Sequence, residues 1–111
     1  MTSQLQQLKQ HSLVVADTGD LEAIRRYQPQ DATTNPSLLL KAFSLSGYQA
    51  LIDEELSSVK ASGGNREEQV KHAVDRLAVA MGSEISAVVP GRVSTEVAAR
   101  LSFDTQASIA K

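Results

Sequence analysis

A strand that runs directly into a helix, at residues 31–40, places the strongest constraint on how this chain folds. The segment reads Asp-Ala-Thr-Thr-Asn-Pro-Ser-Leu-Leu-Leu. Asn35 is a favourable N-cap residue, and Pro36 suits the first helical position, whose N–H has no partner. Because proline pushes the residue before it toward extended backbone, we expect the strand to end at Asn35. Ligands of α/β proteins bind where the carboxyl end of a strand faces a helix N-terminus.

Two further segments have the patterns of strands. The apolar run Leu13–Ala16 ends at Asp17, and a continuous run of this kind predicts a strand covered on both faces. The segment Arg92–Val97 alternates, which predicts a third strand with Val93 and Thr95 on one face. Helical segments separate the three strands, and this alternation predicts an α/β fold with parallel strands.

The predicted helices have recognisable ends. Short helices are expected after Ser3, over residues 21–27 and after Pro36, and a longer one from Tyr48 to the glycines at 63 and 64. Asn65 is expected to cap the longest helix, which ends at Pro90 and has a predicted buried stripe of Val70, Val74, Leu77, Met81, Ile85 and Val88. The last helix begins at Asp104 and meets the end of the sequence with no stop signal, as is typical of a truncated chain.

Composition limits the class of protein. The 111 residues suffice for one domain, 41% of them are hydrophobic and the net charge is −2. Neither nucleic acid nor a membrane is therefore an expected partner, and no apolar run is long enough to span a bilayer. The chain has no cysteine, which excludes thiolate chemistry and fits a cytoplasmic location.

Polar residues gather at the carboxyl ends of all three predicted strands. Counting by twos puts Asn35 on the same side of its strand as Thr33, and Glu96 on the same side as Ser94. If the strands are parallel and curved, these side chains and Asp17 converge, as at the mouth of a barrel enzyme. Two carboxylates with an amide and hydroxyls suit proton transfer on a polyhydroxylated carbonyl compound.

Each candidate also has a purely structural interpretation. Asp17 could simply begin an Asp-Thr-Gly turn, and Asn35 could serve only as a cap. Glu96 could be a solvated edge residue or an ion-pair partner of Arg92 or Arg100. Thr33 and Ser94 fit structural roles better than catalytic ones.

The sequence gives little support for a metal site or for a Schiff-base lysine. His11 and His72 are isolated and have no second ligand at metal-binding spacing, so no metal site is expected. The five lysines all lie on predicted helices or at their ends, and none follows an apolar strand, where a desolvated Schiff-base lysine would be expected. The aromatic residues Tyr27, Phe43, Tyr48 and Phe103 are expected to pack in the core.

Three motifs in this chain resemble those of one enzyme family. They are Val-Val-Ala-Asp-Thr-Gly-Asp at 14–20, Asp-Ala-Thr-Thr-Asn-Pro-Ser at 31–37 and Pro-Gly-Arg-Val-Ser-Thr-Glu-Val at 90–97. Over nearly all its length, the chain resembles the N-terminal part of a bacterial transaldolase of the pentose phosphate pathway. The resemblance implies a (β/α)8 barrel, of which residues 1–111 supply the first helix and three parallel strands without closing the ring.

The resemblance also implies a reaction and roles for individual residues. A dihydroxyacetone unit passes from sedoheptulose 7-phosphate to glyceraldehyde 3-phosphate through a lysine Schiff base, with no cofactor or metal. Asp17 would move the proton of the hydroxyl whose bond cleavage releases the aldose, and Glu96 would work with a bound water. Asn35 would bind the dihydroxyacetone unit, with Thr33 and Ser94 shaping the pocket. Sugar phosphates are the implied partners, and a homo-oligomer is implied, a dimer in the family.

The chain departs from the family pattern in two ways. The lysine belongs to a fourth strand that lies after the last residue of this sequence, so we expect no turnover from this chain alone. Ala98 stands where close relatives often carry an acid. An alternative is a non-catalytic α/β module that self-associates through its open sheet edge or pairs with a complementary piece. A related Schiff-base aldolase, which would differ only in its acceptor, is a third interpretation.

Overall fold

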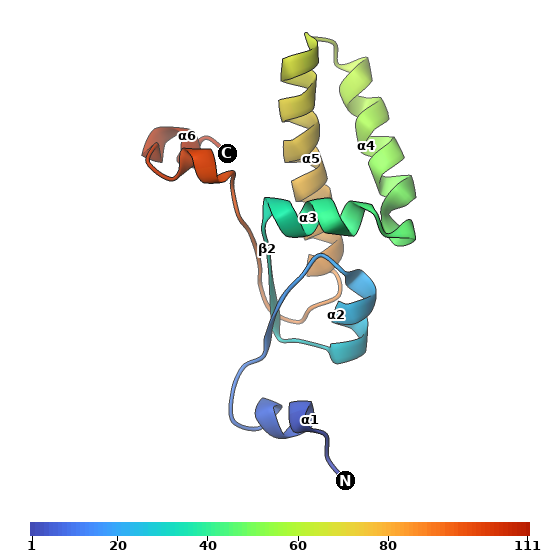
Figure 1. Cartoon of the computed structure of the whole chain (residues 1–111), viewed down its shortest axis with the longest axis vertical. Coiled ribbons are helices and arrows are strands. Elements are labelled where there is room, and N and C mark those ends of the chain that lie inside the picture. The colour runs from blue at the N-terminus through green and yellow to red at the C-terminus, as the bar shows by residue number, and fades with distance from the viewer.

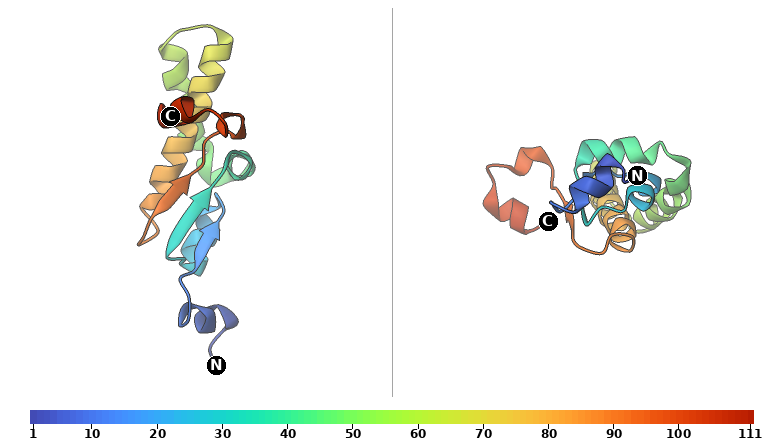
Figure 2. Two further views of the ribbon diagram at one scale, coloured as in Figure 1. Left: turned by 90° about the vertical axis from the view of Figure 1, so that its left-hand side faces the viewer. Right: turned by 90° about the horizontal axis from the view of Figure 1, so that it is seen from below.

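Three parallel strands form the centre of the molecule. The computed structural model describes residues 1–111 and orders the strands β1 (Val15–Asp17), β2 (Asp31–Thr34) and β3 (Val93–Thr95) in one sheet, with every neighbouring pair parallel. The three arrows lie side by side in Figure 2. This arrangement confirms the predicted fold class of parallel strands with surrounding helices, in a sheet that does not close into a ring.

The strands are shorter than the sequence pattern predicted. The backbone ladder continues one step beyond them, because Gln30 N donates to Val14 O at 2.8 Å and Glu96 N donates to Thr34 O at 3.2 Å. Val14 and Glu96 therefore flank the strands. Asn35 was expected both to end the strand and to cap the following helix; it is the N-cap, with extended backbone, and β2 ends one residue earlier, at Thr34.

Helices connect and cover the strands. They are α1 (Gln4–Lys9), α2 (Leu21–Tyr27), α3 (Pro36–Phe43), α4 (Gln49–Ala61), α5 (Arg66–Ser86) and α6 (Thr105–Ile109), with short 3-10 turns η1 (Ser46–Tyr48) and η2 (Ala99–Leu101). Ser3, Asp20, Asn35, Asn65 and Asp104 cap helices with their side chains, as their positions predicted. No helix in the structure is both long and apolar enough to cross a membrane.

One face of the sheet is packed against helices. Ala32 lies at its centre and is 1% exposed, beside the half-buried Val93. The side chains that cover it come from α2 and from the end of α5, where Ile24 and Ile85 are fully buried. This packing places the polar residues of β2, which alternate with Ala32, on the opposite face.

The opposite face of the sheet is open. Val15 is 49% exposed on β1, and Leu13 just before it is 73% exposed. The prediction that this first strand is covered on both faces was therefore wrong. An apolar run predicts burial only when a second layer lies over the sheet, and residues 1–111 place helices on one side alone.

A second buried cluster joins α3, η1 and α5. Leu39 and Ala42 of α3 pack with Tyr48 of η1 and with Met81, which is fully buried in the middle of α5. The long helix thus serves both clusters, with Met81 in one and Ile85, one turn later, in the other. The cluster holds α3 against α5 and so fixes the helix that Asn35 caps.

Helices α4 and α5 form a hairpin that extends beyond the sheet (Figure 1). The turn between them uses Gly63 and Gly64, whose φ angles are +76° and +96° and which lack the Cβ that makes these angles unfavourable. Val70 and Val74 of α5 are 56% and 55% exposed, so the predicted buried stripe begins only at Leu77. The first half of α5 contacts α4 and no sheet, which leaves this part of the stripe open to solvent.

All four aromatic residues were expected to pack in the core, but Tyr27 and Phe103 do not. Tyr48 is 3% exposed, but Tyr27 is 51% exposed and Phe103 is wholly exposed. Phe103 lies between η2 and α6, which project to one side of the sheet (Figure 1). A large apolar side chain there has no neighbouring layer to enter.

Candidate functional site

A row of three polar residues crosses the open face of the sheet. Asp17 is paired in register with Thr33, and Thr33 is paired with Ser94, so each of the three strands contributes one residue. The Thr33 hydroxyl donates a hydrogen bond of 2.9 Å to Asp17 Oδ1. The predicted convergence of these three positions is therefore present in the structure, and Asp17 and Ser94 are exposed.

Asn35 lies two residues after Thr33 and has a structural role as the N-cap of α3. Its Oδ1 accepts a hydrogen bond of 3.0 Å from Leu38 N, and Pro36 follows at the first helical position, as predicted. Because capping needs the amide oxygen, the two Nδ2 protons point elsewhere and make no hydrogen bond within the chain. Asn35 can therefore cap α3 and still donate to a ligand at the carboxyl ends of the strands.

Glu96 lies at the same level on the third strand. Its N–H bonds to Thr34 O, which places Glu96 opposite Asn35 in the continued register. Strand alternation puts its exposed side chain on the same face as Ser94. It makes no ion pair with Arg92 or Arg100, so the interpretation of Glu96 as an ion-pair partner was wrong.

The five predicted residues thus form two levels at the carboxyl ends of the three strands. Asp17, Thr33 and Ser94 make the lower level, and Asn35 and Glu96 make the upper one. Such a set offers carboxylates as proton acceptors, hydroxyls that donate or accept, and one amide that donates. This combination can orient a polyhydroxylated ligand and move a proton on one of its oxygens.

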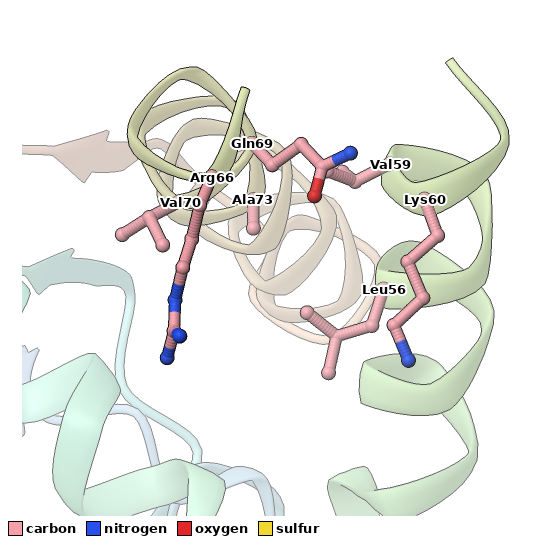
Figure 3. Close-up of a pocket in the computed structure, with 7 residues that line it drawn as sticks. All are labelled: Leu56, Val59, Lys60, Arg66, Gln69, Val70 and Ala73. Atoms are coloured by element: carbon pink, nitrogen blue, oxygen red, sulfur yellow. The ribbon is translucent and has the colours of Figure 1, made fainter. Parts of the chain in front are cut away.

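Two hollows of the molecule lie largely away from the carboxyl ends of the strands. One, of about 220 Å³, lies between α4 and α5 and is shown in Figure 3 with Leu56, Val59, Lys60, Arg66, Gln69, Val70 and Ala73 around it. Another, of about 790 Å³, runs along β3 and the end of α5 and includes Ser94 and Thr95 in its wall. The first has no contact with the polar row, while the second meets it only through Ser94.

No lysine stands among the polar residues. Lys9 on α1 donates from Nζ to the carbonyl oxygens of Tyr27 and Gln28, at 2.6 and 2.7 Å. Lys71 pairs with its helix neighbour Glu67, and Lys41, Lys60 and Lys111 lie on helices or at the chain end. No group of three His, Asp or Glu side chains is arranged to hold a metal ion.

The structure shows one buried polar contact near the site that the sequence did not predict. The Tyr48 hydroxyl donates a hydrogen bond to the carbonyl oxygen of Gly19, in the turn that follows Asp17. Burial, aided by the nearby charges of Asp20 and Glu84, raises the pKa of Tyr48 to about 12. The partners are 29 residues apart and share no motif, so nothing in the sequence pattern indicated the contact.

Comparison with known proteins identifies the family. The model of the transaldolase/fructose-6-phosphate aldolase family matches residues 14–111. That range begins at the residue before β1. It includes all three strands and the five predicted site residues at their carboxyl ends.

Individual relatives agree with the family match. The chain is 72% identical to the transaldolase of Chromohalobacter salexigens over 109 residues, which are 98% of this chain and 34% of that protein. It is 57% identical over all 111 residues to the transaldolase of Haemophilus influenzae, of which it covers 35%, and equally similar to that of Shewanella sp. strain ANA-3. The chain thus spans about a third of the length of these curated relatives, and it belongs to the transaldolase/fructose-6-phosphate aldolase family.

Proposed function

We propose that residues 1–111 carry the first part of a transaldolase active site and belong to a single (β/α)8 barrel domain. In the complete reaction, a dihydroxyacetone unit passes from sedoheptulose 7-phosphate to glyceraldehyde 3-phosphate in the pentose phosphate pathway, in the cytoplasm. The observation that carries the proposal is the row of Asp17, Thr33 and Ser94 across three parallel strands. In barrel enzymes the catalytic groups stand at this end of the strands.

Asp17 is the proposed proton carrier. When the carbon–carbon bond of the ketose breaks, its electron pair moves to the iminium nitrogen of the Schiff base, and the hydroxyl proton of the departing aldose passes to the Asp17 carboxylate. The Thr33 hydroxyl, 2.9 Å from Asp17 Oδ1, holds that carboxylate on the open face. The same transfer in reverse returns the proton when the acceptor aldehyde arrives.

The other residues bind and orient in this proposal. Glu96 acts through a bound water during formation and hydrolysis of the Schiff base. Asn35 donates from Nδ2 to an oxygen of the dihydroxyacetone unit while its Oδ1 caps α3. Thr33 and Ser94 shape the wall of the pocket between the two carboxylates.

We infer that the chain has no turnover by itself. A Schiff base needs an amine at the carboxyl end of a strand, and none of the five lysines stands there. Treatment of the chain with fructose 6-phosphate and borohydride should leave its intact mass unchanged. A borohydride-stable adduct on any lysine would contradict this inference.

A chimera tests the active-site proposal directly. The matched residues of this chain replace the corresponding third of the Chromohalobacter salexigens transaldolase, which supplies the remainder. We expect transaldolase activity, and Asp17→Asn should lower kcat by about 10²- to 10⁴-fold, the usual contribution of a general acid–base group. Asp53→Asn, which removes the same charge on the exposed side of α4, serves as the matched control. An active chimera that tolerates Asp17→Asn would overturn the role of Asp17.

The family description favours a second candidate activity. The matching family model is described as covering both transaldolases and fructose-6-phosphate aldolases, and we propose that an aldolase would use the same Schiff-base step with a different acceptor. Release of free dihydroxyacetone by the chimera, in the absence of an acceptor aldose, would indicate the aldolase. We give this activity second because all three relatives described above are named transaldolases.

A further inference from the structure

The turn at the end of β1 comprises Asp17, Thr18, Gly19 and Asp20, and one side chain from outside the sheet, Tyr48, contacts it. At its first end, Asp17 is held by its pairing with Thr33. At the other end Asp20 caps α2, with Oδ1 accepting from Glu22 N and Ala23 N. Between these two fixed ends, the carbonyl of Gly19 accepts the Tyr48 hydroxyl.

Gly19 is also tightly enclosed. A Cβ at this position would come within 2.9 Å of Ala42 Cβ and 3.3 Å of the Leu38 carbonyl oxygen. The turn therefore lies directly against α3, and a side chain there would push the two apart. Gly19 is buried, so Tyr48 reaches its carbonyl from within the protein rather than across solvent.

Tyr48 is suited to fix this turn. Its ring is packed with Leu39 and Ala42 of α3 and with Met81 of α5, and only 3% of the residue is exposed. Like any tyrosine hydroxyl it is protonated and able to donate throughout the neutral range, and burial raises its pKa further, to about 12. A donor fixed in a packed cluster holds its acceptor more firmly than a mobile surface side chain does.

We propose that the Tyr48 hydroxyl is a positioning group for Asp17, acting through Gly19. The same cluster contains the body of α3, whose N-terminus carries Asn35. Tyr48 thus sets the exit of β1 and the start of α3 relative to one another, and with them the separation of Asp17 from Asn35. This proposal rests on the proposed function, because Asp17 has a task in the reaction only if the chain forms part of a transaldolase site.

The matched pair of variants is Tyr48→Phe and Tyr27→Phe. The first removes the hydroxyl and keeps the packed ring, while the second removes the hydroxyl of a tyrosine that is half exposed and makes no side-chain hydrogen bond. In the chimera described above, Tyr48→Phe should lower kcat by about tenfold to hundredfold, because a small misplacement of a reacting group is costly. KM should stay within about twofold, because Tyr48→Phe keeps the packed ring that holds α3 and leaves the Asn35 cap in place. Tyr27→Phe should change neither constant.

Amide hydrogen exchange on the 111-residue chain supplies a second readout that needs no activity. Tyr48→Phe should speed exchange at the first turn of α2, at Glu22, Ala23 and Ile24, while Val59 of α4 keeps its rate. Equal acceleration at both places, or collapse of the fold, would show that the hydroxyl supports the whole structure and would overturn the positioning role. An active chimera whose kcat is unchanged by Tyr48→Phe would also overturn it.

The two proposals fail in different ways. If the unsubstituted chimera is inactive, the proposed function fails, and the exchange pattern alone then decides whether Tyr48 fixes the turn. If the chimera is active but Tyr48→Phe has no effect on kcat, the proposed function stands and only the positioning role is lost.

Discussion

Asp31 lies so close over Gly91 that a Cβ on this glycine would come within 1.8 Å of Asp31 Oδ1. The same oxygen accepts a hydrogen bond of 2.7 Å from Arg92 N, across 61 residues of sequence. Gly91 N also donates to the carbonyl of Gln30, at 2.9 Å. The start of β3 is thus held against the start of β2 by contacts that only a residue without a side chain at position 91 permits.

Gly91→Ala should therefore destabilise the chain, by about 1–3 kcal/mol in the free energy of unfolding, the usual cost of forcing atoms into a filled site. Urea denaturation followed by circular dichroism measures this. Gly47→Ala is the matched control, because a Cβ there meets nothing within 4 Å, and it should change stability by less than about 0.5 kcal/mol. Asp31→Ala removes the clashing oxygen, so the double variant should lose less than the sum of the two single changes.

The hydrogen bond between Thr33 and Asp17 leads to a prediction about activity. Thr33→Val keeps the shape and β-branching of the residue but removes the hydroxyl that donates to the Asp17 carboxylate. A hydrogen bond to a charged group contributes about 1.5–3 kcal/mol. In the chimera, kcat should thus fall by about tenfold to hundredfold in a coupled assay that measures the aldose product.

The control for this change is Thr33→Ser, which retains a hydroxyl on the same carbon and should keep most of the activity. A loss of activity in Thr33→Ser but not in Thr33→Val would mean that the methyl group, rather than the hydroxyl, matters at this position. The stability of all three proteins should be compared first, because β2 is the central strand.

Much of this structure could be predicted from local sequence chemistry. Asn35 and Pro36 predict the end of β2 and the start of α3. Asn65 and Glu68 form the expected capping box of α5. These features depend on neighbours within four residues, so they are visible in the sequence. Period-2 counting within each strand, together with the expectation of parallel strands, predicted that Asp17, Thr33 and Ser94 converge, and the observed register matches this.

What could not be predicted depends on layers that sequence periodicity does not specify. Val70 and Val74 have the same helical spacing as Met81, yet only Met81 is buried, because the first half of α5 projects beyond the sheet. Leu13 is exposed for the same reason, since no layer covers its face of the sheet. The contact of Tyr48 with Gly19 joins distant segments through one hydroxyl, which no pattern of hydrophobic residues encodes.

The raised pKa of Tyr48 predicts a loss of stability in alkali. A free tyrosine has a pKa near 10, and burial with the nearby carboxylates of Asp20 and Glu84 raises this pKa to about 12, although the backbone of Leu21 and the charge of Arg25 oppose the shift. Below pH 10 the hydroxyl is protonated in both the folded and the unfolded chain, so its stabilising effect is complete. Between pH 10 and about 12 only the unfolded chain releases the proton, which lowers the free energy of unfolding by up to about 1.4 kcal/mol per pH unit.

The measurement is a series of urea denaturations from pH 8 to pH 12 on the chain and on its Tyr48→Phe variant. All other titratable groups are the same in both proteins, so the difference between the two curves isolates Tyr48. The stability difference should be constant below pH 10 and shrink above it. A difference that stays constant up to pH 12 would contradict the raised pKa.

Met81 and Val79 on α5 provide a test of which face of this helix is buried in the core. Met81 is 0% exposed and packs with Leu39, Ala42 and Tyr48, whereas Val79, two residues earlier, is 68% exposed. Met81→Ala should cost about 2–5 kcal/mol, because the cavity it leaves is surrounded by helices that cannot close on it. Val79→Ala, on the same helix, should change the free energy of unfolding by less than about 0.5 kcal/mol, since alanine also favours the helix. Chemical denaturation of both variants at one pH measures the contrast. Similar losses at the two positions would mean that another surface covers Val79 in solution, and light scattering would then show a species larger than the single chain.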